Sequence, residues 1–215
     1  MRGVGVFKKI ILFFYRIYAT FGSLYLLPLL KMESKLSGRG SQNERPVEYS
    51  FAFRCISKIY PKTLLDVGSG ESSFPDLVNH CGIKVVAADK ISGYWKSGFF
   101  NRHYYLVNDD IAHSKIKERF DVVTCISVLE HIHDSASAVK GMFDLLKPGG
   151  YLVMTFPYNE KKYVGNAYRL PNASYGRDFP FICQIFSRKE IDSWLKQNKA
   201  KIVAQEYYDV FTGEF

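Results

Sequence analysis

The stretch LLDVGSGESS, residues 64–73, decides how the rest of the chain is interpreted. A short apolar segment ends at Asp66 and Val67, and two glycines, Gly68 and Gly70, follow it. Because glycine has no Cβ atom, such a turn can be tight and can let a ligand approach the backbone closely. The pair of glycines alone is a weak signal, since many nucleotide-binding folds use one. The interpretation therefore depends on the segments around this turn.

Strand-like and helix-like segments alternate on both sides of this turn. Strands are predicted at residues 63–67, 84–88, 104–107, 121–126, 151–156 and 201–210. Helices are predicted at residues 46–59, 73–80 and 135–146, and after Ser187, where Glu190 completes a capping box. Strands that are apolar on both faces and alternate with helices predict an α/β fold. We expect a three-layer, Rossmann-like sandwich around a mostly parallel sheet.

Polar side chains lie where the predicted strands end. In an open parallel sheet, ligands bind outside the carboxyl ends of the strands, next to the point where the strand order reverses. Asp66 lies inside the end of the first strand, where its carboxylate can anchor the loop and attract a cationic group. Asp89 ends the second strand, 21 residues after Gly68, and can accept hydrogen bonds from both ribose hydroxyls. Asp110 and Ile111 follow the third strand and place a hydrogen-bond acceptor and an apolar wall where an adenine would lie.

At this point the chain resembles the class I S-adenosylmethionine-dependent methyltransferase family. The resemblance covers about residues 44–211 and rests on five segments in the expected order. These are LLDVGSGESSFP (64–75), VVAADK (85–90), NDDIAHS (108–114), FDVVTCISVLEHIHD (120–134) and LLKPGGYLVMTFP (145–157). The resemblance implies S-adenosylmethionine as the cofactor and a seven-stranded sheet whose last strand is antiparallel. The expected cofactor-binding residues are Asp66, Gly68, Ser69, Gly70, Asp89, Lys90, Asp110, Ile111 and Ser127.

Two features depart from the family pattern. The resemblance implies that Asp66 and the glycine loop surround the methionyl part of the cofactor. The third small residue of that loop, often glycine in the family, is Ser72 here, which such a loop tolerates. The sequence also ends at Phe215, soon after the sixth predicted strand, so the seventh strand is expected to be missing. Truncation of a longer protein is the favoured explanation, and completion of the sheet edge by another chain is the alternative.

The pair Glu130-His131 after the fourth strand invites a catalytic or a metal-binding interpretation. Metal-dependent O-methyltransferases of quinone biosynthesis carry a Glu three residues before such a pair, where this chain has Ser127. A metal ion is therefore not expected, and Glu130 is expected to bond into the neighbouring backbone. His131 is the candidate catalytic residue, a general base whose pKa suits proton removal at neutral pH.

Residues 158–186 form a long insertion between the fifth strand and the next helix, and the insertion is rich in aromatic residues. Long ordered loops in compact domains are often functional, and this one lies at the expected ligand-binding edge. The candidate substrate-binding residues are Tyr158, Tyr168, Tyr175 and Arg177. The alternative is a lid that only packs on the domain.

The net charge of +8 comes mostly from the N-terminal segment. Residues 1–40 hold seven Lys and Arg against one Glu, which leaves +2 for the other 175 residues. The rest of the sequence shows no basic stripe with interleaved aromatics, so a nucleic-acid partner is not expected. The four cysteines have no C-x-x-C spacing. This spacing argues against a zinc site or a disulfide framework and favours a reducing, cytoplasmic compartment.

Residues 1–32 are predicted to form a hydrophobic, basic N-terminal helix, followed by a polar linker at 33–43 and a methyltransferase domain at 44–215. Between Ile10 and Leu30 the only charged residue is Arg16. The favoured interpretation is a helix that lies on a membrane surface through residues 7–30, with its basic side chains at the headgroups. The alternatives are a membrane-spanning helix, in which Arg16 would be costly, and a helix packed on the domain or on a partner subunit.

The sequence thus predicts an enzyme that transfers a methyl group from S-adenosylmethionine to a small-molecule acceptor. A helix at a membrane favours a lipid-linked or glycan-related acceptor. Two other functions stay open. A nicotinamide-dependent oxidoreductase would need a glycine where Ser73 stands in the G-x-G-x-x-G pattern. A non-catalytic, membrane-tethered binding protein would keep the fold without the transfer.

Overall fold

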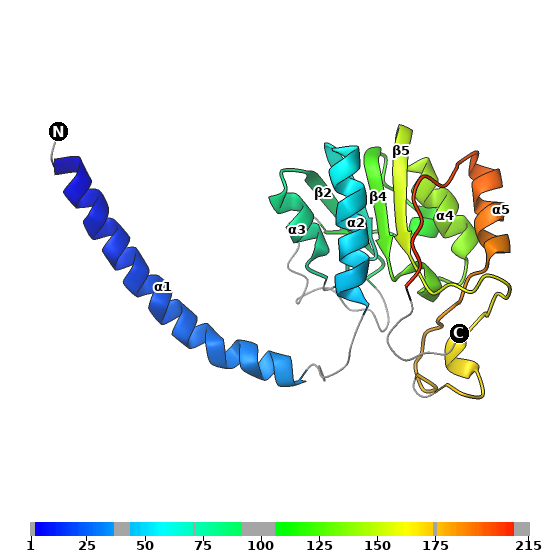
Figure 1. Ribbon diagram of the computed structural model, residues 1–215, viewed down its shortest axis with the longest axis horizontal. Coiled ribbons are helices and arrows are strands. Elements are labelled where there is room, and N and C mark those ends of the chain that lie inside the picture. Colours follow the sequence, from blue (N-terminus) through cyan, green and yellow to red (C-terminus); the bar gives the residue numbers. More distant parts are fainter. Residues whose placement is uncertain (1–2, 37–43, 71, 92–105, 174–175, 209–215) are drawn as a thin grey trace. The chain divides into compact units, whose positions relative to one another are not determined.

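The structure is a computed structural model that describes residues 3–36, 44–70, 72–91, 106–173 and 176–208 (Figure 1). The chain divides into two units, Met1–Asn43 and Glu44–Phe215. The first unit contains helix α1 (Gly3–Leu36), and the second unit is an α/β domain.

Helix α1 carries an exposed apolar surface. Its side chains from Ile10 to Phe21 are all exposed, and Pro28 lies within the helix. Because α1 ends at Leu36, it takes in the first residues of the segment predicted as a linker. Within the part of the chain that the structure describes, no helix combines the length and the apolarity that a membrane crossing requires.

The second unit is built on a five-stranded parallel sheet. The strands are β1 (Thr63–Val67), β2 (Lys84–Asp89), β3 (Leu106–Asn108), β4 (Phe120–Ile126) and β5 (Leu146–Thr155). They lie in the order β3-β2-β1-β4-β5, and every neighbouring pair is parallel. The strand order reverses between β1 and β4, so a ligand crevice is expected at the carboxyl ends of these two strands.

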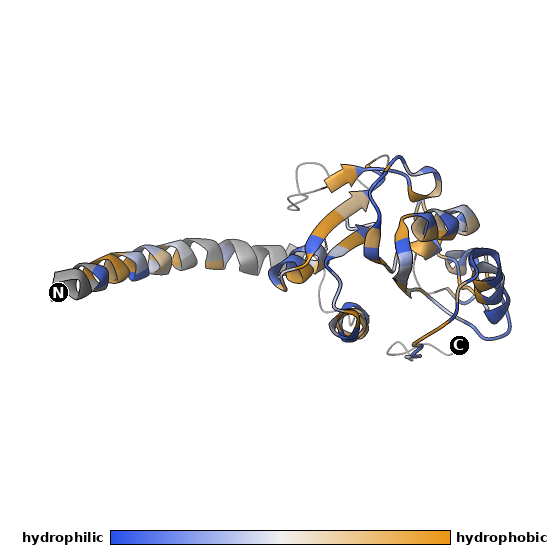
Figure 2. Ribbon diagram, turned by 90° about the horizontal axis from the view of Figure 1, so that it is seen from above, coloured by the Kyte–Doolittle hydropathy of each residue, from blue (hydrophilic) through white to orange (hydrophobic). Residues whose placement is uncertain are grey.

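Helices cover both faces of the sheet. They are α2 (Arg45–Ile59) and α3 (Phe74–His80) on one face, and α4 (Ser135–Asp144) and α5 (Arg188–Asn198) on the other. Successive residues of a strand point to opposite faces: Leu64 packs in the core that contains α2 and α3, whereas Leu65 packs with α4 and α5. Figure 2 shows the hydrophobic residues gathered in the strands between the helices. The described residues of the unit also contain three short 3₁₀ turns: η1 (Ile111–His113), η2 (Leu129–His131) and η3 (Ala167–Arg169).

The predicted three-layer α/β fold is confirmed. Pro46 lies in the first turn of α2, and Glu190 accepts a hydrogen bond from the Ser187 N–H at 2.9 Å, as a capping box requires. The start of β5 differs from the prediction. The glycine turn at residues 148–150 lies inside this strand, where the pairing with β4 passes from Leu146 to Tyr151 across an irregular stretch.

The sixth predicted strand, residues 201–210, is wrong over the residues that the structure describes. Residues 201–208 are exposed and lie outside the sheet. Side chains hold this segment instead: Arg54 on α2 donates to the Tyr208 hydroxyl at 3.0 Å, and Arg188 on α5 donates to the Tyr207 hydroxyl at 2.7 Å. Strand propensity reflects how well a residue fits a half-buried pleated surface, and it does not show which strand the segment pairs with. The apolar pattern of this segment could therefore not reveal where the segment lies.

Candidate functional site

The glycine turn after β1 packs against the turn that follows β4. Gly68 has a φ of +73°, which favours glycine, and its N–H donates to the carbonyl oxygen of Ala88 at 2.8 Å. A Cβ atom at this position would lie 2.3 Å from Cγ1 of Val128. The absence of a side chain at Gly68 is therefore what lets the two turns touch.

Asp89, at the end of β2, faces the same glycine turn. Gly70 has a φ of +50°, and its N–H donates to Oδ2 of Asp89 at 2.7 Å. Burial raises the pKa of Asp89, and the hydrogen bond from Gly70 opposes this shift. A Cβ atom at Gly70 would meet only Oδ2 of Asp89, at 4.0 Å, among the described residues. Described atoms therefore leave room for at least a side-chain carbon at the position of Gly70.

Asp66 lies beneath the turn, inside the end of β1. The residue is 4% exposed, and Oδ1 accepts a hydrogen bond from Thr124 Oγ1 at 2.6 Å. Burial raises the pKa of Asp66 to about 7, because a charge is costly away from water. A cationic group placed next to it would favour the carboxylate. Beside it, the buried Ser69 Oγ has no hydrogen-bond partner among the described residues.

The residues that follow β2 and β3 form an ion pair. Lys90 Nζ lies 2.6 Å from Oδ2 of Asp110, and Oδ1 of Asp110 accepts the N–H of Ala112 at 3.1 Å. The hydrogen bond from Lys90 lowers the pKa of Asp110. Ile111 is 6% exposed and belongs to the core that contains α4. The structure thus joins Lys90 to Asp110 and buries most of Ile111.

A second polar cluster surrounds the turn after β4. Ser127 has a φ of +47°, rare for a residue with a Cβ atom. Its N–H donates to the carbonyl oxygen of Thr155 at 3.1 Å and its hydroxyl to Oε1 of Glu48 on α2. The same Oε1 accepts the Thr155 hydroxyl at 2.7 Å. Arg45 Nη1 reaches Oε2 of Glu48 at 3.3 Å and the carbonyl oxygen of Ile126 at 3.0 Å. These contacts tie the start of α2 to the carboxyl ends of β4 and β5.

Glu130 and His131 lie in η2, next to this cluster. His131 Nδ1 lies 2.6 Å from the carbonyl oxygen of Ile182, and its ring meets Phe181 edge to face at 5.2 Å between centroids. Burial lowers the pKa of His131, so the imidazole is neutral at pH 7. Glu130 is 4% exposed, and its Oε1 lies 4.0 Å from Nε2 of His131. Both residues line a large groove, together with Glu48 and Ser127.

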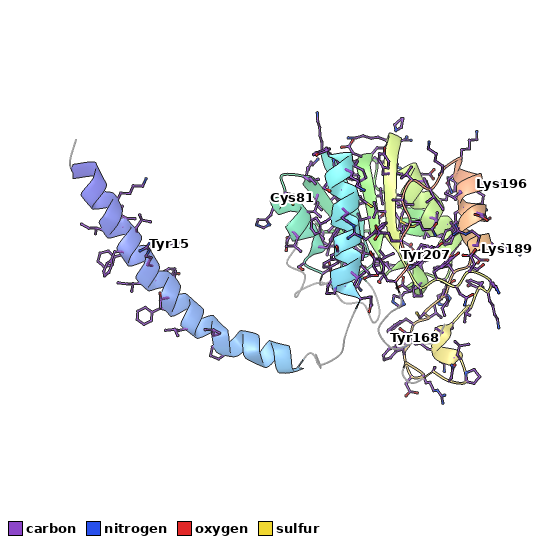
Figure 3. All side chains as sticks on the ribbon, in the orientation of Figure 1. Tyr15, Cys81, Tyr168, Lys189, Lys196 and Tyr207 are labelled. Atoms are coloured by element: carbon purple, nitrogen blue, oxygen red, sulfur yellow. The ribbon has the colours of Figure 1, made fainter. Side chains whose placement is uncertain are left out.

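The loop of residues 156–186 lies at the same end of the domain as the start of α2 (Figure 1). Tyr168, labelled in Figure 3, packs edge to face on Phe181 at 5.9 Å and on Phe179 at 5.2 Å, so it belongs to the aromatic group around His131.

Two other predicted substrate-binding residues make different contacts, although Tyr158 lines the same groove as His131 and Tyr168. Tyr158 packs on Tyr207 at 5.2 Å, with Arg188 above its ring, and Arg177 donates to the carbonyl oxygen of Pro171 at 2.9 Å. Tyr175 lies outside the described residues.

No feature of the sequence indicated that three residues belong to this site. Arg45, Glu48 and Thr155 lie in ordinary positions of a helix and a strand, and Glu48 is 79 residues from Ser127 along the chain. Only the packing of α2 on the sheet brings them together. Among the described residues, no group of three His, Cys, Asp or Glu side chains is arranged to hold a metal ion.

Comparison with known proteins identifies the family of this chain. A methyltransferase-domain family matches residues 42–205. The chain belongs to the class I S-adenosylmethionine-dependent methyltransferase family. Members of this family use S-adenosylmethionine as the methyl donor.

Two curated relatives are ubiquinone biosynthesis O-methyltransferases. The one from Alkalilimnicola ehrlichii is 27% identical over 167 residues, which cover 71% of this chain and 66% of that protein. The one from Pseudomonas fluorescens is 30% identical over 112 residues, 48% of each. The chain therefore spans about half to two thirds of the length of these relatives.

Two solved structures share the fold. A methyltransferase from Clostridium acetobutylicum aligns with a TM-score of 0.56 at 17% identity, over 87% of this chain and 89% of that one. The 1,6-didemethyltoxoflavin-N1-methyltransferase of Burkholderia thailandensis, solved with S-adenosylhomocysteine, aligns with a TM-score of 0.54 at 16% identity, over 82% and 77%.

The donor side of this methyltransferase domain fits the cofactor of its family. The Ser69 hydroxyl, which has no partner among the described residues, and the carboxyl groups of Asp66 and Asp89 lie at or next to one turn. They offer hydrogen-bond acceptors to an ammonium group and to ribose hydroxyls, which S-adenosylmethionine carries.

Proposed function

We propose that this chain transfers the methyl group of S-adenosylmethionine to a hydroxyl group of a small-molecule acceptor. The cofactor, when bound, supplies a methyl group on a sulfonium sulfur, which is already an activated leaving group. The protein's main task is to hold donor and acceptor in line and to exclude water, from which most of the acceleration comes. The printed names of the two curated relatives, both O-methyltransferases, support a hydroxyl acceptor.

The geometry of His131 carries the proposal. Because Nδ1 lies 2.6 Å from the carbonyl oxygen of Ile182, this nitrogen holds the proton and donates it, and Nε2 has the lone pair. A neutral imidazole that lines the groove and has its lone pair on Nε2 suits removal of a proton from a hydroxyl. An uncharged amine needs no base before it attacks, so a base at this position favours a hydroxyl acceptor.

The donor is assigned to the residues predicted from the sequence. Asp66 and the turn from Gly68 to Gly70 would contact the methionyl part, and Asp89 the ribose. The remaining assignments are Lys90, Asp110 and Ile111 at the adenine, and Ser127 at the border with the acceptor groove.

An acceptor screen tests the function. The full chain would be incubated with S-adenosylmethionine and with pairs of compounds that differ only in a hydroxyl or an amine at one position. Release of S-adenosylhomocysteine is expected with the hydroxyl members of these pairs. Turnover confined to amines would contradict the hydroxyl assignment, and failure of S-adenosylhomocysteine to bind in calorimetry would contradict the cofactor.

We further propose that α1 binds a membrane surface and that the acceptor is lipid-linked or glycan-related. Phe14, Tyr18 and Phe21 are 64%, 78% and 69% exposed and lie on one face of the helix, and residues 1–40 carry a charge of +6. Aromatic side chains on a basic helix are typical of binding to an anionic bilayer surface.

Serine in place of Phe14, Tyr18 and Phe21 should release the chain from membranes. Vesicles of phosphatidylcholine with phosphatidylserine are expected to co-sediment the wild-type chain. The triple variant should stay in the supernatant, because each lost aromatic removes apolar area that the bilayer would bury. Variants at Tyr207 and Tyr208, equally aromatic but in the other unit, serve as the control. Equal sedimentation of wild type and triple variant would contradict the proposal.

A further inference from the structure

Ser127 holds a backbone conformation that serine rarely adopts. Its φ of +47° lies in the left-handed region, which glycine enters readily and a residue with a Cβ atom does not. Such conformations persist only where the surrounding structure fixes them, and they are concentrated at functional sites. Ser127 stands where β4 ends and the chain turns into η2, so its φ sets the direction in which the chain leaves the sheet.

The polar groups on both sides of the link between Ile126 and Ser127 are held by neighbouring elements. The carbonyl oxygen of Ile126 accepts a hydrogen bond from Arg45 Nη1 at 3.0 Å. The Ser127 N–H donates to the carbonyl oxygen of Thr155 at 3.1 Å and to its Oγ1 at 3.0 Å. The Ser127 hydroxyl donates to Oε1 of Glu48, which also accepts the Thr155 hydroxyl at 2.7 Å. Oε1 of Glu48 is thus the common acceptor of the two hydroxyl groups.

Glu48 is suited to hold Ser127 because it is itself fixed. It lies in the first turn of α2 with 11% of its side chain exposed, and Arg45 Nη1 lies 3.3 Å from its Oε2. Hydrogen bonds to a carboxylate are stronger than those between neutral groups, and a site with little water strengthens them further. The first turn of α2 therefore holds the end of β4 through two side chains.

The turn that Ser127 directs carries the residues next to the donor turn and the proposed base. Val128 occupies the space beside Gly68, where a Cβ atom would lie 2.3 Å from Cγ1 of Val128. The His131 N–H donates to the carbonyl oxygen of Val128 at 2.9 Å, which starts η2 at this residue. A different φ at Ser127 would therefore move Val128 and η2 together.

We propose that Glu48 is a positioning residue that holds Ser127 in its left-handed conformation and thereby places the turn of Val128 and His131. The consequence for methyl transfer rests on the proposed function, whereas the hold of Glu48 on Ser127 does not. Without the hydrogen bond to Oε1, Ser127 should move to a more usual φ in most molecules. A protein whose binding-competent conformation is only partly populated binds its ligand more weakly by that fraction.

Nuclear magnetic resonance on the full chain tests the conformation of Ser127 without a ligand. A left-handed residue brings its own N–H and Hα protons close together, which gives a strong cross-peak within the residue. We expect this cross-peak in the wild type and in Glu48→Gln, whose amide oxygen still accepts both hydroxyls. Glu48→Ala should lose it. Its persistence in Glu48→Ala, or an equal loss in Glu48→Gln, would overturn the proposal.

Ser127→Ala removes the same hydrogen bond from the other side and keeps the Cβ atom. Residue 127 should lose the cross-peak in this variant as well, and a cross-peak as strong as in the wild type would overturn the proposal. This variant decides if Glu48→Ala does not fold.

Calorimetry with S-adenosylhomocysteine measures the effect at the donor turn. Glu48→Ala should weaken binding about tenfold, because an unsupported left-handed conformation is disfavoured by at least that factor in a residue other than glycine. In a Ser127→Gly background the same change should cost less than about threefold, since glycine needs no support. Equal losses in the two backgrounds would overturn the proposal.

Glu118→Ala is the matched control for these measurements. Glu118 is an exposed glutamate that pairs with Lys84 at 2.9 Å, and its replacement should leave the affinity for S-adenosylhomocysteine unchanged. A wild-type chain that does not bind S-adenosylhomocysteine would contradict the proposed function. The magnetic resonance result would then still decide whether Glu48 holds Ser127.

Discussion

Methyl transfer is expected to slow about 10²–10⁴-fold when His131 is replaced by Asn, which is the range that general-base catalysis covers. The amide of Asn can still donate to the carbonyl oxygen of Ile182, but it has no lone pair with the basicity of Nε2. The geometry around the residue is therefore kept while the base is lost. The rate is measured as S-adenosylhomocysteine release with a hydroxyl acceptor from the screen.

Two comparisons make this result specific. His133→Asn, at the exposed histidine two residues away, should leave the rate unchanged. The affinity of His131→Asn for S-adenosylhomocysteine should equal that of the wild type, because His131 does not lie at the donor turn. A variant that transfers methyl groups at a third of the wild-type rate or faster would refute the role of His131 as base.

Replacing Asp89 with Asn is expected to weaken S-adenosylhomocysteine binding roughly 10- to 100-fold. A hydrogen bond to a charged group contributes about 1.5–3 kcal/mol, and 1.4 kcal/mol corresponds to a factor of ten in affinity. The amide oxygen of Asn can still accept the Gly70 N–H, now 2.7 Å from Oδ2. Its NH₂ group cannot accept a hydrogen bond from a ribose hydroxyl. The substitution should therefore weaken ligand binding and leave the structure of the turn unchanged.

Calorimetry of the full chain measures this effect. Asp144→Asn is the matched control, because Asp144 lies on α4 and pairs with Lys140, with 60% of its side chain exposed. Its affinity for S-adenosylhomocysteine should not change. Binding by Asp89→Asn within threefold of the wild type would remove Asp89 from the cofactor site.

The sequence is enough to predict strands β1 to β5 and the glycine turn after β1, because these are local patterns. Strands β1, β2 and β4 are short apolar runs, and parallel order places their carboxyl ends side by side. Asp66 and Asp89 end two neighbouring strands, so they lie near one another once the topology is known. The glycines between them have φ values that this turn requires.

The acceptor side could not be predicted in the same way. Glu48 meets Ser127 and Thr155 only because α2 packs its first turns on the carboxyl ends of β4 and β5, and no spacing in the sequence encodes that contact. The aromatic residues of the loop are not spaced with the period of a helix or a strand. The sequence therefore gives no reason to place Tyr158 and Tyr168 in different surroundings. The structure places Tyr168 next to Phe181 and Tyr158 against Tyr207, in different groups.

The contact between Gly68 and Val128 has a thermodynamic consequence. Gly68 belongs to the turn assigned to the donor, and Val128 begins the turn that carries the proposed base. A ligand that orders either turn also restricts the other, so the two ligands should bind cooperatively. Linkage requires that the factor by which the acceptor tightens donor binding equals the factor by which the donor tightens acceptor binding. Gly68 would thus serve as the point of communication between two halves of a ternary complex.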